Sequence, residues 1–445
     1  MCVVVGSRGA SCGTYGAYEN DIGVTRERHA DRARRPARKS RSSSSEVTRE
    51  TYENARMVFD EFLNERSAQC VRASTETRTH FGAPVETPPY PGGPPPGTGA
   101  VLTEMVRAAA AAWHRNMSYV MRGKWALVSD SDCDEAEFQG FACIFPGLSR
   151  SCRALEGENP MLNLQDAQDF WRHWSKKLSV DAIFLFGLAA DALTDVRHAS
   201  IKVKSFFEHD LTNALAGSES EGIVVGIHFR NRGDIRLDGR LRIPLERYVE
   251  WVDGLGNSTK IRAVYVATDH DGLDIRELNE RFPGRSYKFR MIKRLWAPAT
   301  ATNLWQTTTA TAGGLTFENA KTQMVVEALS DINILSHCDA FLGSISNFLP
   351  FIMSLLHARD PLRERGRVCG FMNTNVATFG GHAAAEELTK ATSKFGSGLD
   401  DAHAGDVGSK EAIVSCVGDR SLRDYWMVLY GHNIPSDTAD VLPVR

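Results

Sequence analysis

The sequence predicts an α/β protein, with a Rossmann-like parallel-sheet domain over residues 216–375 and a largely helical domain over residues 100–215 before it. Two observations predict this class. From residue 222 onward, short apolar runs alternate with helical segments, a pattern typical of a parallel sheet covered by helices on both faces. In residues 165–215, by contrast, the apolar residues recur at helical spacing and strand-like runs are few.

Composition describes an ordinary globular chain. Its 445 residues carry a formal net charge of -3 and are 42% hydrophobic, which leaves room for two domains with full cores. Nothing in this charge balance suggests a nucleic-acid partner. The nine cysteines include no C-x-x-C pair, so a zinc ribbon or finger is not expected. One disulfide could form among Cys133, Cys143 and Cys152.

Targeting signals are not evident in this sequence. No apolar run is long enough to span a bilayer, so we expect no transmembrane segment in this chain. The opening "MCVVVGSRGASCG" lacks the basic start and the sustained apolar run of a secretory signal. Either the protein is not secreted or this N-terminus is not the native one, and the localisation stays unknown.

The ends of the chain differ in composition from its middle. Residues 1–99 are expected to be a disordered leader, with an Arg and Ser rich run at 20–45 and a Pro and Gly linker at 83–99. A helix-like segment between these two stretches is expected either to pack on the folded part of the chain or to remain detached from it. Residues 376–445 are expected to pack back on the fold or to be partly disordered.

Elements within the predicted domains follow from their patterns. The helical domain should begin with a helix over 100–121 and a short strand over 124–130, before the helices of 165–215. Strands of the sheet are predicted at 223–229, 261–269, 286–292 and 339–344. Helices between and after them are predicted at 273–282, 317–338 and 348–358.

Polar residues follow three of the predicted strands at the points where those strands end. They are His228, Arg230, Arg232, Thr268, Asp269, Ser344 and Ser346. Ligands of open parallel sheets bind in the crevice beyond the carboxyl ends of the strands. A guanidinium matches phosphate oxygens, and the helix predicted to begin after Ser346 adds a positive dipole end. The sequence therefore predicts a nucleotide diphosphate site, without a P-loop or a G-x-G-x-x-G motif.

Three ordered segments resemble the GDP-fucose-dependent fucosyltransferases. They are "GIHFRNRGD", "VYVATDHDGLDIRELNERFP" and "LSDINILSHCDAFLGSISN", within residues 220–358. The pattern is closest to that of the alpha-1,6-fucosyltransferases of core N-glycans or nodulation oligosaccharides, with the protein O-fucosyltransferases more distant. The resemblance implies a GT-B-like fold and an inverting, metal-independent transfer of L-fucose from GDP-fucose to a glycan. It also implies that the enzyme acts in the Golgi or secretory lumen.

The resemblance also implies roles for single residues. Arg230 would contact the beta-phosphate of GDP-fucose and stabilise the GDP leaving group. His228 and Asp331 match positions that these enzymes use around the guanine base. Ser346 matches a phosphate-contacting Ser, and Asp269 matches the first acid of the family's second motif.

Two departures from the family pattern affect these roles. Asn231 separates Arg230 from Arg232, where the family has two adjacent arginines, so the division of roles between them stays open; the spacing from His228 favours Arg230 for phosphate. The family's downstream Glu, its presumed base, falls on Gly239. The adjacent Asp238 is our candidate general base, with a loop carboxylate in a surface ion pair as the alternative.

Two further interpretations come from other classes of protein. Asp130 and Asp132 form an Asp-x-Asp after a predicted strand, which is how other glycosyltransferases hold a divalent metal against a nucleotide sugar. The missing Glu also suggests a relative that binds GDP-fucose without catalysis. Under the favoured interpretation, that of a metal-independent fucosyltransferase, the partners are GDP-fucose and a glycan or glycoprotein acceptor, or a protein Ser/Thr, and no metal or other cofactor is expected.

Overall fold

The structure is a computed structural model that describes a defined part of the chain. The described residues are 48–72, 79–81, 98–116, 118–120, 127–132, 141–145, 164–195, 199–215, 221–230, 243–269, 273–294, 296–298, 308–310, 317–344, 346, 348–363, 366–373 and 412–416.

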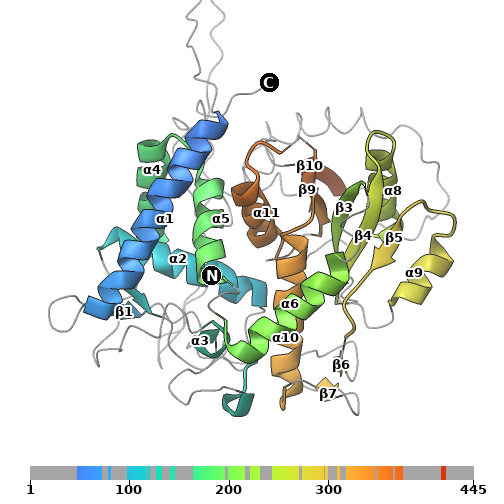
Figure 1. Cartoon of the computed structure of the whole chain (residues 1–445), viewed down its shortest axis with the longest axis horizontal. Helices are drawn as coiled ribbons and strands as arrows, with labels where there is room; N and C mark the ends of the chain where they lie inside the picture. Colours follow the sequence, from blue (N-terminus) through green and yellow to red (C-terminus); the bar gives the residue numbers. More distant parts are fainter. Residues whose placement is uncertain are drawn as a thin grey trace, which may run out of the picture. The chain divides into compact units, whose positions relative to one another are not determined.

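A six-stranded sheet has the order β10-β9-β8-β3-β4-β5 (Figure 1). Its strands are β3 (Ile223–Phe229), β4 (Ile261–Thr268), β5 (Lys288–Arg290), β8 (Ala340–Gly343), β9 (Val368–Asn373) and β10 (Ala412–Cys416). Every neighbouring pair is parallel except β10 with β9, which is antiparallel. The predicted α/β class and its parallel sheet are confirmed.

Helices cover both faces of this sheet because alternate residues of each central strand point to opposite sides. Along β3, Val224 belongs to one apolar cluster and Val225 to another. Tyr265 and Val264 divide in the same way on β4. The helices of this part are α8 (Leu245–Gly256), α9 (Ile275–Arg281), α10 (Ala320–Leu335) and α11 (Phe348–Arg359).

The part of the chain before the sheet is mainly helical, as predicted. Its helices are α1 (Arg49–Arg72), α2 (Thr98–His114), α3 (Phe141–Ile144), α4 (Leu164–Leu178), α5 (Ala182–Leu193) and α6 (Ile201–Leu215). Two small pairs of strands complete the described elements: β1 (Thr79–Phe81) with β2 (Ser118–Val120), and β6 (Trp296–Pro298) with β7 (Thr308–Ala310). Buried residues of these helices and of α10 and α11 form one continuous apolar cluster.

Helix α1 lies within the stretch expected to be a leader. Tyr52, Ala55, Phe59 and Leu63 are buried, and their spacing of three to four residues places them on one face of the helix. Phe59 packs edge-on against Trp174 of α4 with ring centroids 5.2 Å apart. The helix-like piece therefore docks, whereas both low-complexity stretches around it lie outside the described residues.

Two elements predicted near the start of the helical domain differ from those in the structure. Helix α2 ends at His114, seven residues earlier than predicted, because Asn116 has a φ of 61° and leaves the right-handed helical region. The strand predicted at 124–130 is not formed in its described residues, where a turn leads into a 3-10 helix at Asp130–Asp132. The backbone N–H of Ser129 donates to the Thr322 hydroxyl at 2.9 Å, so this loop is fixed to α10.

The C-terminal segment contributes the edge strand β10. Its Cys416 is disulfide-bonded to Cys369 of β9, across 47 residues of sequence. Cys143 is disulfide-bonded as well, while Cys338 is a free and buried thiol. The remainder of the predicted segment 376–445 lies outside the described residues. Among the described helices, none combines the length and the apolar content needed to cross a bilayer.

Helices α5 and α11 touch at their backbones through Gly187. A Cβ atom on this glycine would overlap the carbonyl oxygen of Ser354 and would lie 2.6 Å from the Cβ of Ala358. Both neighbours belong to α11, so this contact joins the helical part of the chain to a helix of the sheet.

We predict that Gly187→Ala lowers the free energy of unfolding by about 2 kcal/mol, since the new methyl group forces two packed helices apart. The control is Gly254→Ala in α8, where an added Cβ meets nothing within 4 Å. It should raise stability by about 0.5–1 kcal/mol because it removes a helical glycine. Urea unfolding followed by circular dichroism measures both. A Gly187→Ala protein as stable as wild type contradicts the close packing.

Candidate functional site

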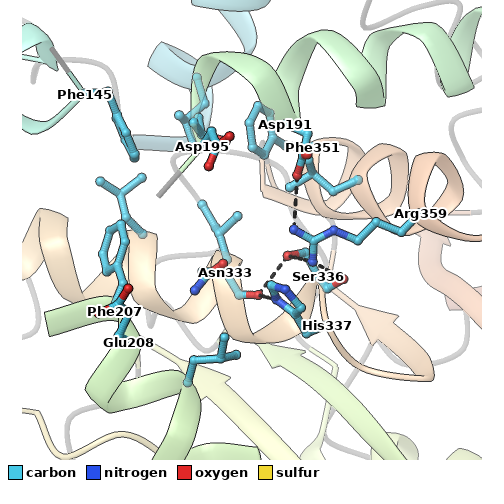
Figure 2. Close-up of a pocket in the computed structure, with 16 residues that line it drawn as sticks. Phe145, Asp191, Asp195, Phe207, Glu208, Asn333, Ser336, His337, Phe351 and Arg359 are labelled. Carbon is cyan, nitrogen blue, oxygen red and sulfur yellow. Dashed lines mark hydrogen bonds and ion pairs between the residues drawn. The ribbon is translucent and has the colours of Figure 1, made fainter. Parts of the chain in front are cut away.

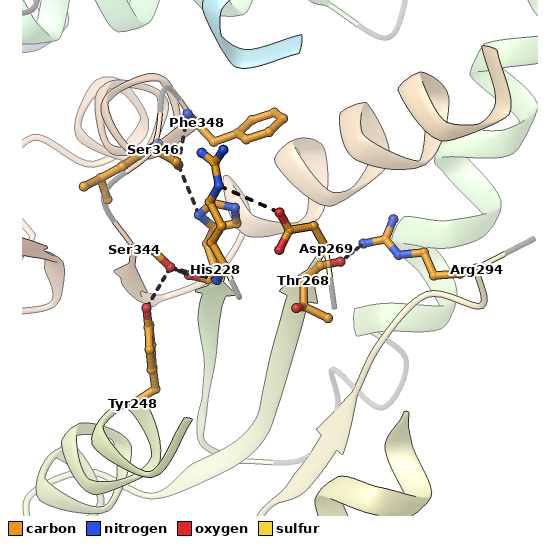
Figure 3. A network of polar contacts seen from close by, with 10 residues as sticks. His228, Tyr248, Thr268, Asp269, Arg294, Ser344, Ser346 and Phe348 are labelled. Carbon is orange, nitrogen blue, oxygen red and sulfur yellow. Dashed lines mark hydrogen bonds and ion pairs between the residues drawn. The ribbon is translucent and has the colours of Figure 1, made fainter. Parts of the chain in front are cut away.

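Three parallel strands bring their carboxyl ends together at one edge of the sheet. Phe229 of β3 pairs with Thr268 of β4, and His228 pairs with Gly343 of β8. The residues that follow these strands, Arg230, Asp269 and Ser344, therefore come next to one another. We call His228, Arg230, Asp269, Ser344 and Ser346 the strand-end cluster (Figure 3).

The Ser344 hydroxyl ties the ends of β8 and β3 together. It donates to the carbonyl of His228 at 2.8 Å and accepts the backbone N–H of Arg230 at 2.9 Å. Because its one proton is used, the 2.7 Å contact with Tyr248 is a bond that the phenol donates. Ser344 is buried and these bonds hold the backbone on which Arg230 stands, which favours a structural role for its side chain.

The Arg230 side chain lies beside Asp269. Its Nε is 3.8 Å from Asp269 Oδ2, and their side chains are 15% and 25% exposed. The guanidinium is thus at the protein surface yet partly desolvated, a setting in which a charge acts more strongly than in open water. This position suits a cation that has to meet an incoming anion.

His228 is partly buried between charged neighbours. Burial, followed by the charges of Arg230 and Arg294, lowers its pKa to about 4, although Asp269 acts in the opposite direction. The ring is therefore neutral at pH 7. Phe348 packs edge-on against it, with ring centroids 5.6 Å apart.

Ser346 caps the helix that starts beside this ring. Its hydroxyl accepts the backbone N–H groups of Phe348 and Leu349 at 3.2 and 3.3 Å, and lies 3.4 Å from Nδ1 of His228. Since two acceptor positions are used, its proton is directed to Nδ1, which places the ring proton on Nε2. The third residue of α11 is Pro350, which has no N–H. An anion at this helix end would therefore compete with Ser346 for the first two amides, while the positive helix dipole remains available.

A buried charge network supports the cluster from the neighbouring strand. Arg294 forms a short ion pair with Asp331 of α10, lies 3.8 Å from Glu327, and donates to the carbonyl of Thr268 at 3.1 Å. Tyr265 donates to Asp331 at 2.6 Å. Burial works to lower the pKa of Arg294, but the charges of Asp331 and Glu327 outweigh it and raise that pKa, so the guanidinium stays charged.

In this network both carboxylate oxygens of Asp331 are bonded to other side chains of the protein. The sequence predicted it near a guanine base, and the structure places its two carboxylate oxygens against Tyr265 and Arg294. Arg294 also links Asp331 to the end of β4 through Thr268. Sequence reasoning missed Arg294 because it stands in no motif; the two positive residues Lys293 and Arg294 directly after the predicted strand 286–292 were the available signal.

Other predicted site residues are described only in part. Arg232 and Asp238 lie outside the described residues, and so does the side chain of Asp130. Asp132 is buried, and its two carboxylate oxygens accept the backbone N–H groups of Glu318 and Asn319 at 2.5 and 3.2 Å. These amides belong to the two residues before α10, whose N-cap is Asn319, so Asp132 anchors the segment that leads into that helix. Across the described ranges, no group of three or more His, Cys, Asp or Glu is arranged to hold a metal ion.

Comparison with known proteins finds similar chains among solved structures only. A scan of the sequence against protein-family models and curated proteins finds no match. The NodZ alpha-1,6-fucosyltransferase soaked with GDP-fucose is 11% identical, with 63% of this chain and 93% of that chain covered at a TM-score of 0.35. Fucosyltransferase NodZ from Bradyrhizobium is 13% identical, with 69% and 98% covered at a TM-score of 0.34.

An Arabidopsis thaliana FUT1 variant in complex with GDP gives a similar result, at 11% identity, 69% and 76% coverage and a TM-score of 0.35. With similarity this low, the activity of the present chain rests on its own residues.

The environment of His228 predicts a pH dependence of stability. Its pKa of about 4 in the folded state lies below the 6.5 of an exposed ring, so between these values the unfolded chain binds the additional proton. The free energy of unfolding should then fall as pH decreases from 6.5 to 4, by up to about 3 kcal/mol. Urea unfolding at a series of pH values measures this slope.

In His228→Gln the slope over this window should flatten. His209→Gln is the matched control, because that side chain is 74% exposed and its change should leave the slope as in wild type. Equal slopes for wild type and His228→Gln would show that this histidine is not held neutral by its surroundings.

Substitution of Asp132 separates an anchor of the segment before α10 from a metal ligand. Asp132→Asn keeps one oxygen acceptor but turns an NH2 donor toward the other backbone N–H, so we predict a loss of about 1–2 kcal/mol, and Asp132→Ala, which leaves both N–H groups unpaired, should cost about 2–3 kcal/mol. Thermal unfolding in the presence and absence of added Mn²⁺ measures both variants. A wild-type protein that gains stability with Mn²⁺, and loses that gain in Asp132→Asn, would contradict the anchoring role.

Proposed function

We propose that this chain is a glycosyltransferase that transfers L-fucose from GDP-fucose to a glycan acceptor, in the manner of an alpha-1,6-fucosyltransferase, without a metal ion. One observation carries the proposal. Arg230, His228 and the start of α11 converge at the carboxyl ends of β3 and β8, where open parallel sheets bind their ligands. The three ordered motifs that resemble fucosyltransferases run through these same elements.

The reaction is an inverting single displacement. A base takes the proton of the acceptor hydroxyl, its oxygen forms a bond to C1 of fucose, and the bond between C1 and the phosphate oxygen breaks. The electron pair of that bond leaves with GDP. Negative charge grows on the beta-phosphate, so a fixed cation beside it stabilises the transition state more than the ground state.

Arg230 is the residue to which we assign this cation. Its backbone is fixed by Ser344, and its guanidinium stays partly buried beside Asp269. Arg232 would contribute further positive charge, and the helix dipole of α11 acts in the same direction. Neutral His228, with its proton on Nε2, would donate one hydrogen bond to the nucleotide.

The base and the metal independence are further parts of the proposal. Asp238 is the carboxylate that we assign to the acceptor hydroxyl, close to where the family has its Glu. Asp132 supports a metal-free reaction because both of its oxygens already accept backbone N–H groups, those of Glu318 and Asn319. The acceptor is a glycan or glycoprotein in this proposal, and a protein Ser/Thr hydroxyl is the other acceptor class to be assayed.

The test measures GDP release and fucose transfer by the full chain, with GDP-fucose and a panel of N-glycan, oligosaccharide and peptide acceptors. We predict transfer that survives EDTA, falls by a factor of about 100 or more in Arg230→Ala, and is partly retained in Arg230→Lys, which keeps the charge but not the bidentate fork. Asp238→Asn should reduce the rate by about 100-fold while GDP still binds.

Arg276→Ala is the matched control, because this arginine of α9 is 82% exposed and pairs only weakly with Glu280 at 3.9 Å. Its transfer rate should equal that of wild type. Activity that disappears with EDTA would support the metal-dependent alternative. A chain that binds GDP-fucose but releases no GDP with any acceptor in the panel would be a binding protein that lacks catalysis.

A further inference from the structure

Arg294 contacts the strand-end cluster through the last residue of β4. Its guanidinium donates to the carbonyl of Thr268 at 3.1 Å. Asp269 follows directly in the chain, and its carboxylate lies 3.8 Å from Nε of Arg230. In Figure 3, Thr268 and Asp269 stand between Arg294 and His228. Arg294 is thus connected to residues of the cluster through the end of one strand.

The other bonds of Arg294 are to α10. It forms a short ion pair with Asp331, whose other oxygen accepts the Tyr265 hydroxyl at 2.6 Å, and it lies 3.8 Å from Glu327. A guanidinium has five donors in a rigid plane, so it can hold a carbonyl and a carboxylate at the same time in one fixed geometry. A lysine ammonium keeps the charge but lacks this fork. The Arg294 side chain therefore fixes the end of β4 to α10.

The charge of Arg294 also reaches the His228 ring. Burial has the largest effect on this ring and lowers its pKa, Asp269 acts to raise it, and the charges of Arg230 and Arg294 lower it further. The contacts that Ser346 and the start of α11 make with the ring are uncharged. Arg294 therefore contributes to the neutral state of the ring at pH 7 from behind the strand end.

We propose that Arg294 is a positioning residue of the nucleotide site, which holds the end of β4 so that Asp269 keeps the Arg230 guanidinium directed toward the diphosphate. It acts through Thr268 and Asp269, without contacting the nucleotide itself. This inference rests on the proposed function, since it presupposes a nucleotide at the strand ends. Without the fork, Asp269 and the long side chain of Arg230 would have to be ordered when the nucleotide binds, which weakens binding about two- to tenfold.

Arg359 makes a matched arrangement before the opposite end of β8 (Figure 2). It donates to the Ser336 carbonyl at 2.7 Å and to Asp191 at 3.1 Å, so it also joins a backbone carbonyl to a carboxylate. Its side chain is 29% exposed, against 23% for Arg294. Ser336, His337 and Arg359 line a cavity of about 250 Å³. The length of β8 alone separates Ser336 from the strand-end cluster by about 10 Å or more.

The test compares Arg294→Lys with Arg359→Lys, since each keeps the charge and loses the fork. Isothermal titration calorimetry on the full chain at pH 7 measures the dissociation constant of GDP. Arg294→Lys should bind GDP about two- to tenfold more weakly than wild type, and Arg359→Lys should bind it as wild type does. Wild-type affinity in Arg294→Lys, or an equal loss in both variants, overturns the inference. A wild-type chain that binds no GDP overturns the proposed function, and the inference with it.

A second readout separates positioning from a general rearrangement of the site. Arg294→Gln/Asp331→Asn removes the guanidinium together with its closest carboxylate, so that neither stays buried without the other. NMR of carbon-13 labelled histidine between pH 7 and pH 4.5 follows the His228 ring, with His228→Gln to assign its signal. The midpoint should rise by about half a pH unit or more in the double variant and stay at its wild-type value in Arg294→Lys, which keeps the charge.

The two readouts together decide the role of Arg294. Weaker GDP binding with a wild-type His228 titration in Arg294→Lys is the result expected of a positioning residue. A lysine variant that titrates like the double variant has lost the charge from its place, and such a rearranged site overturns the inference. The double variant should bind GDP at least as weakly as Arg294→Lys. Wild-type affinity in the double variant overturns the inference even where the lysine variant does not fold.

Discussion

The parallel pairing of β3 with both β4 and β8 is the constraint on which the candidate site depends. Parallel neighbours end at the same edge of a sheet, so residues 230, 269 and 344 meet although more than a hundred positions separate the first from the last. The Ser344 hydroxyl extends this order one step past the strands by bonding both His228 and Arg230. The point from which the Arg230 side chain extends thus follows from backbone geometry, and Asp269 lies beside its guanidinium.

Buried polar interactions hold the helices to this edge. Arg294 connects Asp331, near the carboxyl end of α10, with the last carbonyl of β4, and Ser346 connects the first turn of α11 with the His228 ring. An unpaired charge in such a position would be costly, and the Arg294 network compensates its charge with carboxylates and a phenol. The same contacts that satisfy these groups also fix the arrangement of the strand ends.

Much of this arrangement could be predicted from local sequence. The strand 223–229 was placed at its observed bounds and the helix around Asp331 within three residues at each end, because an apolar run and a helical period are local signals. The parallel pairing of the strands follows from the alternation of strands and helices along the chain. These signals also indicated which polar residues stand at strand ends.

The remainder could not be predicted, for physical reasons. Pairing of Cys369 with Cys416 and the addition of β10 to the sheet depend on contacts across a long sequence separation, which no local pattern encodes. The bonds from Asp132 to the amides before α10 are of the same kind, since the sequence pattern of an acidic loop fits a metal ligand equally well. Nor does any motif indicate that Arg294 joins Thr268 to Asp331, which are 26 and 37 positions away from it in the sequence.

Hydrogen exchange with and without GDP tests the central claim most directly, because it locates the nucleotide without assuming an acceptor or a catalytic base. The account predicts slower amide exchange at the carboxyl ends of β3, β4 and β8 and in the first turn of α11, with unchanged exchange around Ser336 and His337. Protection confined to the amino end of β8, or no protection at saturating GDP, would contradict a nucleotide site at the strand-end cluster.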